Sequence, residues 1–136
     1  MQIKPANLMD VSRMVFVFGS NEAGRHGAGA AKYAHDRRRA QYGTSFGMTG
    51  TCFAIPTMDW NLRPLTVQLI SKYVEIFLDF AERTPPTNYQ VTCIGCGLGG
   101  KTHADIAPMF VSAPSNCYFD LLWEKWLPGK QFWGTF

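Results

Sequence analysis

Two glycine-rich segments contain the residues of this sequence that could approach a ligand most closely. Residues 19–29 and residues 95–100 each contain four glycines, and each segment follows an apolar run that is typical of a buried strand. Backbone N–H groups that follow a strand can hold a phosphate group without a charged side chain. The first segment alone is equally compatible with a simple connection and does not match the dinucleotide-binding fingerprint. Together, the two segments favour a ligand with a diphosphate group.

Polar side chains in and beside these segments are candidates for chemistry. Asn21 could orient ligand hydroxyl groups or a water molecule, or it could simply form a local turn. Free histidine titrates near neutral pH, so His26 and His103 are candidates for an acid or a base, although loop histidines are often only solvated. Lys101 and Asp105 could supply an electrostatic clamp or a base, or a helix cap. We take Asn21, His26 and Asp105 as the candidate catalytic residues.

Residues 95–102 also satisfy the spacing of the Walker A sequence. Lys101 and Thr102 stand where a triphosphate and magnesium would be bound. However, only residues 101–136 remain for the following helix, an acidic magnesium-binding strand and the rest of a sheet, and Pro108 shortens that helix. A P-loop NTPase is therefore an alternative and not the main prediction.

The cysteines favour no metal or redox site. Four cysteines are too few for a small secreted disulfide scaffold, so we expect reduced thiols. Cys93 and Cys96 have the spacing of redox and zinc sites, but no second pair of this kind completes a zinc pattern. Cys52 and Cys117 fall in predicted strands, where they would be buried. The sequence predicts neither a metal nor a cofactor.

The strands and helices around the glycine-rich segments must position them. Strands are predicted at residues 14–18, 51–55, 89–94 and 116–119, and helices at residues 30–41, 65–83 and within 105–110. In this interpretation Pro56 closes the second strand. Strands that alternate with helices predict an α/β fold with a mixed, largely parallel sheet. In such sheets, ligands bind beyond the carboxyl ends of the strands, which both glycine-rich segments follow.

One predicted helix has a clear apolar face that should pack on the sheet. Its apolar residues recur at three-and-four spacing over residues 65–83. They are Leu69, Ile70, Tyr73, Val74, Phe77, Leu78 and Ala81. We expect this face to form much of the core.

The composition limits the class of protein. The chain has 136 residues, of which 46% are hydrophobic and 17% are charged, so it is globular and fits a single domain, residues 1–136, with a core at about residues 14–119. A net charge of +3 does not indicate nucleic-acid binding, and Lys32 with residues 37–39 is typical of a solvated helix face. No run reaches the ~20 apolar residues of a membrane span, and residues 1–11 lack a signal-peptide pattern, so we expect a soluble cytoplasmic protein.

The C-terminal extension, residues 120–136, is rich in aromatic side chains. Trp123, Trp126, Trp133 and Phe136 all lie beyond the last predicted strand. Partly exposed aromatic residues often mark interfaces. We therefore expect this extension to form a homo-oligomer contact or a lid over the site.

The glycine-rich segments resemble those of the macro domain family, whose members bind ADP-ribose. Residues 25–31 resemble the loop that contacts the distal ribose, and residues 94–98 resemble the loop around the diphosphate, in the branch that contains terminal ADP-ribose protein glycohydrolase. Residues 18–31, 54–57 and 94–108 also resemble small macro-like proteins of bacteria and their phages. The resemblance covers most of residues 14–119. It implies a three-layer macro-like domain whose central sheet is flanked by helices.

The sequence departs from the glycohydrolase branch at the positions of its chemistry. That branch uses a lysine that attacks the distal ribose and an aspartate in the diphosphate loop, but residues 55–58 contain no lysine and Gly99 follows Leu98. The Gly-Asp-Ile or Gly-Asp-Leu sequence whose acid contacts adenine is also missing, and Asp10 is at best a loose substitute. The resemblance therefore implies binding more than hydrolysis.

We predict a domain that binds ADP-ribose or a related adenine nucleotide through backbone amides. The predicted ligand-binding residues are Gly19, Ser20, Asn21, Gly27, Ala28, Gly29, Ile94, Gly95, Cys96, Gly97, Leu98, Gly99 and Gly100. One alternative is an ADP-ribosyl hydrolase that acts on an ADP-ribosylated macromolecule or on ADP-ribose phosphate. Another is a phage-type protein that sequesters a nucleotide defence signal, such as a cyclic ADP-ribose, in the host cytoplasm.

Overall fold

The structure, a computed structural model, describes residues 6–136. The strands of these residues form a seven-stranded sheet. The strands are β1 (Ala6–Asn7), β2 (Val15–Asn21), β3 (Gly47–Thr49), β4 (Cys52–Met58), β5 (Tyr89–Val91), β6 (Cys117–Asp120) and β7 (Gln131–Thr135), in the order β1-β7-β6-β5-β2-β4-β3. The five central strands are parallel, and β1 and β3 pair antiparallel at the two edges. The predicted mixed, largely parallel sheet is confirmed.

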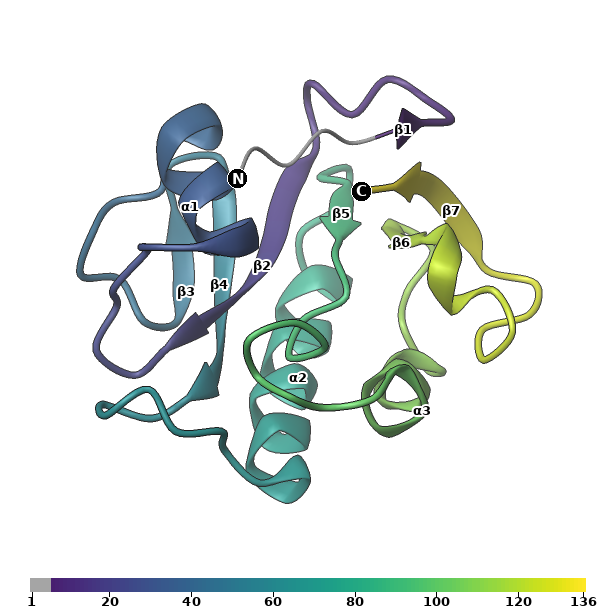
Figure 1. Ribbon diagram of the computed structural model, residues 1–136. Coiled ribbons are helices and arrows are strands. Elements are labelled where there is room, and N and C mark those ends of the chain that lie inside the picture. Colours follow the sequence, from purple (N-terminus) through teal and green to yellow (C-terminus); the bar gives the residue numbers. More distant parts are fainter. Residues whose placement is uncertain (1–5) are drawn as a thin grey trace.

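Helices cover both faces of the sheet (Figure 1). The helix α1 (Gly29–Arg38) packs on one face, and α2 (Val67–Glu82) with the short α3 (His103–Ile106) packs on the other. The 3-10 helices η1 (Ala107–Phe110) and η2 (Leu121–Trp123) follow α3 and β6. Successive side chains of β2 point to opposite faces, so Phe16 and Phe18 pack against α1, whereas Val15 and Val17 pack on the α2 side. The predicted three-layer α/β fold is confirmed.

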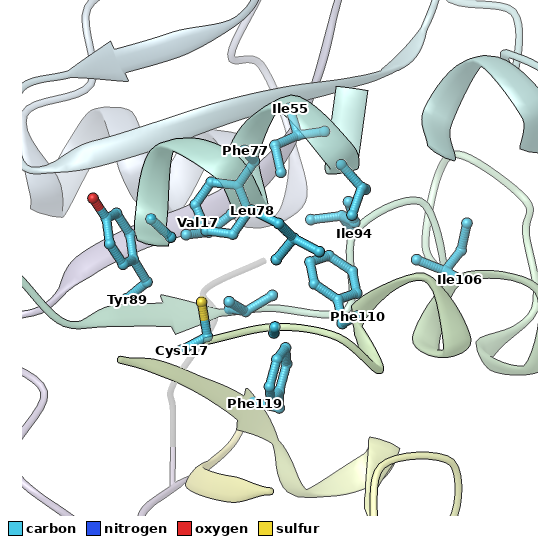
Figure 2. Packing of buried hydrophobic residues seen from close by; sticks show 14 of the residues in the cluster. Val17, Ile55, Phe77, Leu78, Tyr89, Ile94, Ile106, Phe110, Cys117 and Phe119 are labelled. Atoms are coloured by element: carbon cyan, nitrogen blue, oxygen red, sulfur yellow. The ribbon is translucent and has the colours of Figure 1, made fainter. Parts of the chain in front are cut away.

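The larger part of the core lies between α2 and the sheet. Figure 2 shows side chains of this layer, among them Phe77 of α2, Val17 of β2 and Ile94 after β5. The buried residues of α2 are Ile70, Val74, Phe77, Leu78 and Ala81, as predicted. Leu69 is exposed and Tyr73 is half-buried. Each of these two precedes a buried position by one residue, which places it about 100° around the helix at the margin of the buried stripe.

The central strands end at other residues than the sequence predicts. β2 continues through residues 19–21, which pair with the end of β4, and β4 continues through Pro56 to Met58. The prediction that Pro56 closes the strand is wrong because β3 pairs with β4 only as far as Ala54, so no strand needs a donor from Pro56 on that side. Conversely, β5 stops at Val91, before the predicted end at Ile94.

The C-terminal tail contributes a strand that the sequence did not predict. β7 pairs parallel with β6, and Trp133 within it is completely buried, with its indole N–H donating to the Val91 carbonyl at 2.9 Å. Trp123 is completely buried as well, whereas Trp126 and Phe136 are partly buried. The expected exposure of Trp123 and Trp133 is therefore wrong. A homo-oligomer contact through this segment stays a prediction.

Within residues 6–136, no helix is both long enough and apolar enough to cross a membrane. The prediction that the chain begins without a signal peptide involves residues 1–5, which lie outside the described residues.

Candidate functional site

A cavity of about 400 Å³ opens at the carboxyl ends of β2, β4 and β5. Its volume lies in the range of small-molecule binding sites. Its wall contains Gly19, Ser20, Asn21, Arg25, Gly27, Ala28, Gly29, Ala30, Ala31, Thr57, Met58, Leu62, Thr92, Cys93, Ile94, Gly95, Gly97, Leu98 and Gly99. Both glycine-rich segments therefore contribute to the same cavity.

Asn21 ends β2 and closes the turn that follows it. Its Nδ2 donates to the Arg25 carbonyl at 2.8 Å, and its Oδ1 accepts from the Arg25 N–H at 3.0 Å. Inside this turn, Gly24 has a left-handed φ of +68° and lies against Gly43, whose backbone would be 2.3 Å from a Cβ at position 24. Asn21 therefore lines the cavity and also fixes the backbone of Arg25 beside it.

The first turn of α1 supplies backbone donors to the cavity wall. The N-cap residue Ala28 makes no side-chain hydrogen bond to the helix. Among residues 6–136, no acceptor is found for the backbone N–H groups of residues 27–31. Because the first N–H groups of a helix carry partial positive charge, this turn is suited to an anion.

The segment after β5 folds into a compact loop with donors of its own. The N–H of Gly100 donates to the Gly97 carbonyl at 3.1 Å, and the N–H of Lys101 donates to the Gly95 carbonyl at 2.8 Å. In the part of the chain that the structure describes, the N–H groups of residues 97–99 have no protein acceptor. Such a loop of free backbone N–H groups can bind an anion.

At two positions of the cavity wall that hold glycine, the backbone conformation would also allow a residue with a side chain. At Gly27 and Gly97 φ lies outside the left-handed range, and a Cβ would meet no heavy atom within 4 Å. At Gly99, by contrast, a Cβ would lie 2.8 Å from the Gly95 carbonyl oxygen. Gly27 and Gly97 therefore leave open space beside the backbone, where a ligand can come close to the N–H groups.

Most polar side chains of the wall are engaged with the backbone of the protein. The hydroxyl groups of Ser20, Thr57 and Thr92 each donate to a backbone carbonyl. Among the lining residues, Arg25 has the one basic side chain, and none is an Asp, Glu, His or Lys. Donors for a bound anion therefore come from the backbone and from Arg25.

Most of the predicted ligand-binding residues line the cavity. The exceptions are Cys96, whose side chain packs against the core, and Gly100, which follows the lining part of the loop. Of the three candidate catalytic residues, Asn21 lines the cavity, whereas His26 and Asp105 do not. The structure thus brings the two glycine-rich segments together without these two titratable side chains.

His26 and Asp105 have local partners away from the cavity wall. His26 is buried between aromatic rings, with Nε2 at 3.0 Å from the Thr44 carbonyl oxygen, and this burial lowers its pKa. The Asp105 carboxylate accepts from the Thr102 N–H at 3.2 Å, and the Thr102 hydroxyl accepts from the Asp105 N–H at 3.1 Å. These reciprocal bonds form a capping box at the start of α3.

The two residues that complete the Walker A spacing lie outside the cavity wall. Lys101 and Thr102 do not line the cavity, and the Thr102 hydroxyl is used in the capping box. α3 contains only four residues before Ala107 begins a 3-10 helix. A P-loop needs its lysine and hydroxyl at the bound phosphates, so this arrangement disfavours that alternative.

Burial raises the pKa of all four thiols. The pKa of Cys52 and of Cys96 is about 11, and that of Cys117 is about 12. The pKa of Cys93, which lines the cavity, is raised by burial and by the nearby Asp120 carboxylate. Because the thiolate is the reactive form of cysteine, these shifts disfavour thiol-based redox chemistry at neutral pH.

Several lining residues are absent from the list of predicted ligand-binding residues, although the first three of them lie in the segment 25–31 that resembles the ribose loop. They are Arg25, Ala30, Ala31, Thr57, Met58, Leu62, Thr92 and Cys93. Thr57 and Met58 could have been found from the rule that ligands lie beyond strand ends, once β4 was allowed to continue past Pro56. Leu62 has no such signal, because its position depends on how the loop after β4 turns back.

Comparison of the sequence with family models and with curated proteins finds no match. The structure, however, is similar to a solved structure of Thermosipho africanus DarTG in complex with ADP-ribose, with a TM-score of 0.55 and 15% sequence identity. The similarity covers 82% of this chain and 39% of that chain, so this chain spans well under half of the protein that it matches. The fold is macro-like. At this identity the similarity shows the fold and no more.

In this macro-like fold, the departures from the glycohydrolase branch fall at or near the cavity. Gly99, at the position where the resemblance to that branch would place an aspartate, lines the cavity. Residues 55–58, which lack the lysine, form the end of β4, and Thr57 and Met58 among them also line it. Asp10 does not line the cavity, and its carboxylate accepts from the Ser12 N–H at 2.9 Å.

Proposed function

We propose that this protein binds ADP-ribose or a closely related ADP-ribosyl nucleotide in the cavity. The observation that carries the proposal is that two groups of free backbone N–H donors, residues 27–31 and 97–99 of the described chain, belong to the wall of one cavity. A diphosphate has enough acceptor oxygens to use donors from both sides. The macro-like fold and the similarity to DarTG, solved with ADP-ribose, support this choice of ligand.

We further propose that the ligand is bound and not hydrolysed. General acid or base catalysis needs a titratable side chain within hydrogen-bond reach of the reacting group. Among the lining residues there is no carboxylate, imidazole or amine, and both ends of the Asn21 amide are bonded to Arg25. An ADP-ribosyl hydrolase is therefore less well supported than a protein that retains its ligand intact, as a sequestering protein would.

The first experiment is thermal unfolding and calorimetry with ADP-ribose, cyclic ADP-ribose, NAD and ATP with magnesium. A ligand at about 100 times its Kd stabilises the folded state by about 2.7 kcal/mol, which raises Tm by several degrees. We expect a shift with ADP-ribose or its cyclic form that does not depend on magnesium, and full recovery of the ligand after incubation. A shift with magnesium and ATP alone, lost in Lys101→Ala, would support the P-loop alternative instead.

A pair of variants tests whether the ligand occupies this cavity. Gly97→Glu places a carboxylate in the open space beside the free N–H groups, and we expect it to abolish binding while Tm without ligand stays within a few degrees of wild type. Val111→Glu introduces the same charge at an exposed residue that does not line the cavity, and we expect normal binding. Normal binding by Gly97→Glu would show that the ligand lies elsewhere.

A further inference from the structure

Leu62 has a backbone conformation that leucine rarely adopts. Its φ is +60°, in the left-handed region that favours glycine and asparagine. The turn around it is held by Asp59, whose Oδ1 accepts from the Asn61 N–H at 2.8 Å and from the Arg63 N–H at 2.9 Å. The backbone adds bonds from the Leu62 N–H to the Asp59 carbonyl and from the Asp59 N–H to the Arg63 carbonyl. These bonds together hold Leu62 in its strained conformation.

The strained turn places an apolar side chain at the cavity. Leu62 lines the cavity although 47% of it is exposed, and Leu98 also lines the cavity although 70% of it is exposed. Leu62 follows β4 and Leu98 follows β5, and these two strands flank β2 on opposite sides. The cavity thus has an exposed leucine from each of two separate loops.

This step rests on the proposed function, in which the ligand is an ADP-ribosyl nucleotide. The base of such a ligand has two flat apolar faces and a polar edge. A site that distinguishes bases needs donors and acceptors placed at the polar edge of the base. Here the hydroxyl protons of Ser20, Thr57 and Thr92 are used by backbone carbonyls, and no lining residue has a carboxylate to accept from an amino group. Apart from Arg25, and with the free backbone N–H groups assigned to the diphosphate, the side chains of the wall therefore offer apolar contact to a base and few groups that could distinguish one base from another.

We propose that Leu62 and Leu98 form an apolar clamp for the base, so that the site selects the diphosphate and ribose of its ligand and tolerates different bases. The strained turn at Leu62 serves to hold one side of this clamp. The ligand class is then nucleoside diphosphate riboses in general, with ADP-ribose as one member.

Substitution of Leu62 tests whether its side chain contributes to ligand affinity independently of the stability of the fold. Asparagine tolerates the left-handed conformation, so Leu62→Asn relieves the strain and removes the apolar contact. We expect the Tm of Leu62→Asn to equal or exceed that of wild type. Its affinity for ADP-ribose should fall about tenfold, whereas its affinity for inorganic pyrophosphate, which has no base, should stay the same as in wild type. Leu122→Asn is the matched control, because Leu122 is exposed but does not line the cavity, and it should bind normally.

A series of ligands tests tolerance of the base directly. We expect calorimetry with ADP-ribose and with its hypoxanthine and guanine counterparts to give Kd values within about threefold of one another. A preference of more than about threefold for one base would overturn the tolerance of different bases, and wild-type affinity in Leu62→Asn would overturn the clamp. If the wild-type protein bound none of the three, the proposed function itself would be overturned.

Discussion

The indole N–H of Trp123 donates to Nδ1 of His103 at 2.9 Å. This bond joins the C-terminal tail to His103, the first residue of α3. His103 follows the N-cap residue Thr102, which lies just after the glycine-rich loop of residues 95–100. The His103 ring also lies against Trp126, with 6.1 Å between ring centroids. Because Nδ1 accepts a hydrogen bond, the neutral His103 ring must carry its proton on Nε2. The tail therefore orients the side chain that begins α3.

We predict that His103 is present as the Nε2–H tautomer. Nitrogen-15 NMR of the imidazole ring at pH 7.5 should show an unprotonated Nδ1 in the wild-type protein. Trp123→Phe keeps an aromatic ring in the core and removes the donor, so the two tautomers should become mixed and the free energy of unfolding should fall by about 1–3 kcal/mol. The same tautomer population in wild type and Trp123→Phe would contradict this assignment.

The glycines of the first loop should differ sharply in their tolerance of alanine. Gly24→Ala brings a Cβ to 2.3 Å from the backbone of Gly43 at a left-handed φ, so we expect a loss of at least about 2 kcal/mol in the free energy of unfolding. Gly27→Ala meets open space at an ordinary φ, so stability should be unchanged or higher by up to about 1 kcal/mol. Urea unfolding of both variants checks the contrast, and equal losses would refute it.

Features that depend on local pattern were predictable from the sequence. Two apolar runs, at residues 14–18 and 51–55, correspond to β2 and β4, and the helical periodicity at residues 65–83 corresponds to α2. These patterns are predictable because the period of a strand or a helix is set by residues that are close in the sequence. Both glycine-rich segments, recognised from composition, line the cavity because each follows a parallel strand. Fold class and the general place of the cavity therefore follow from local sequence.

Features that depend on distant contacts were not predictable. Trp133 of β7 is buried because the strand pairs with β6 and because its ring packs with Val11 and Met14, more than a hundred residues earlier in the chain. Likewise, the continuation of β4 past Pro56 depends on how far β3 reaches, and the lining position of Leu62 depends on the Asp59 turn. Aromatic residues alone cannot indicate whether a partner segment covers them.

His26 should make stability depend on pH in mildly acidic solution. Burial disfavours its charged form and lowers its pKa below the usual value of about 6.5, with the Thr44 carbonyl opposing the shift and His35 adding to it. The unfolded state therefore binds more protons between the two pKa values, so stability is greatest above about pH 6.5 and falls as pH decreases through this window. The lowered pKa values of the exposed Asp10 and Asp36 affect stability only at more acidic pH.

Urea unfolding between pH 5 and pH 7.5 measures this effect. We expect the free energy of unfolding of the wild-type protein to decrease toward pH 5 and that of His26→Gln, which cannot titrate at this position, to change less. His35→Gln is the control, because His35 is exposed and should leave most of the pH dependence in place. A pH dependence that is identical in His26→Gln and wild type would exclude His26 as its source.

Trp133 should be among the residues whose loss costs most stability. Its side chain is completely buried against Val11 and Met14, and its indole N–H donates to the Val91 carbonyl of β5, two strands away across β6. Trp133→Ala removes this packing and leaves that acceptor without its partner, so we expect a loss of about 3–5 kcal/mol in the free energy of unfolding. Trp60→Ala, at a residue that is 66% exposed, should change stability by less than about 0.5 kcal/mol.

Truncation after Pro128 removes β7 altogether and should prevent folding, as circular dichroism and sedimentation would show. A truncated chain that folded as stably as wild type would mean that the tail is dispensable to the sheet.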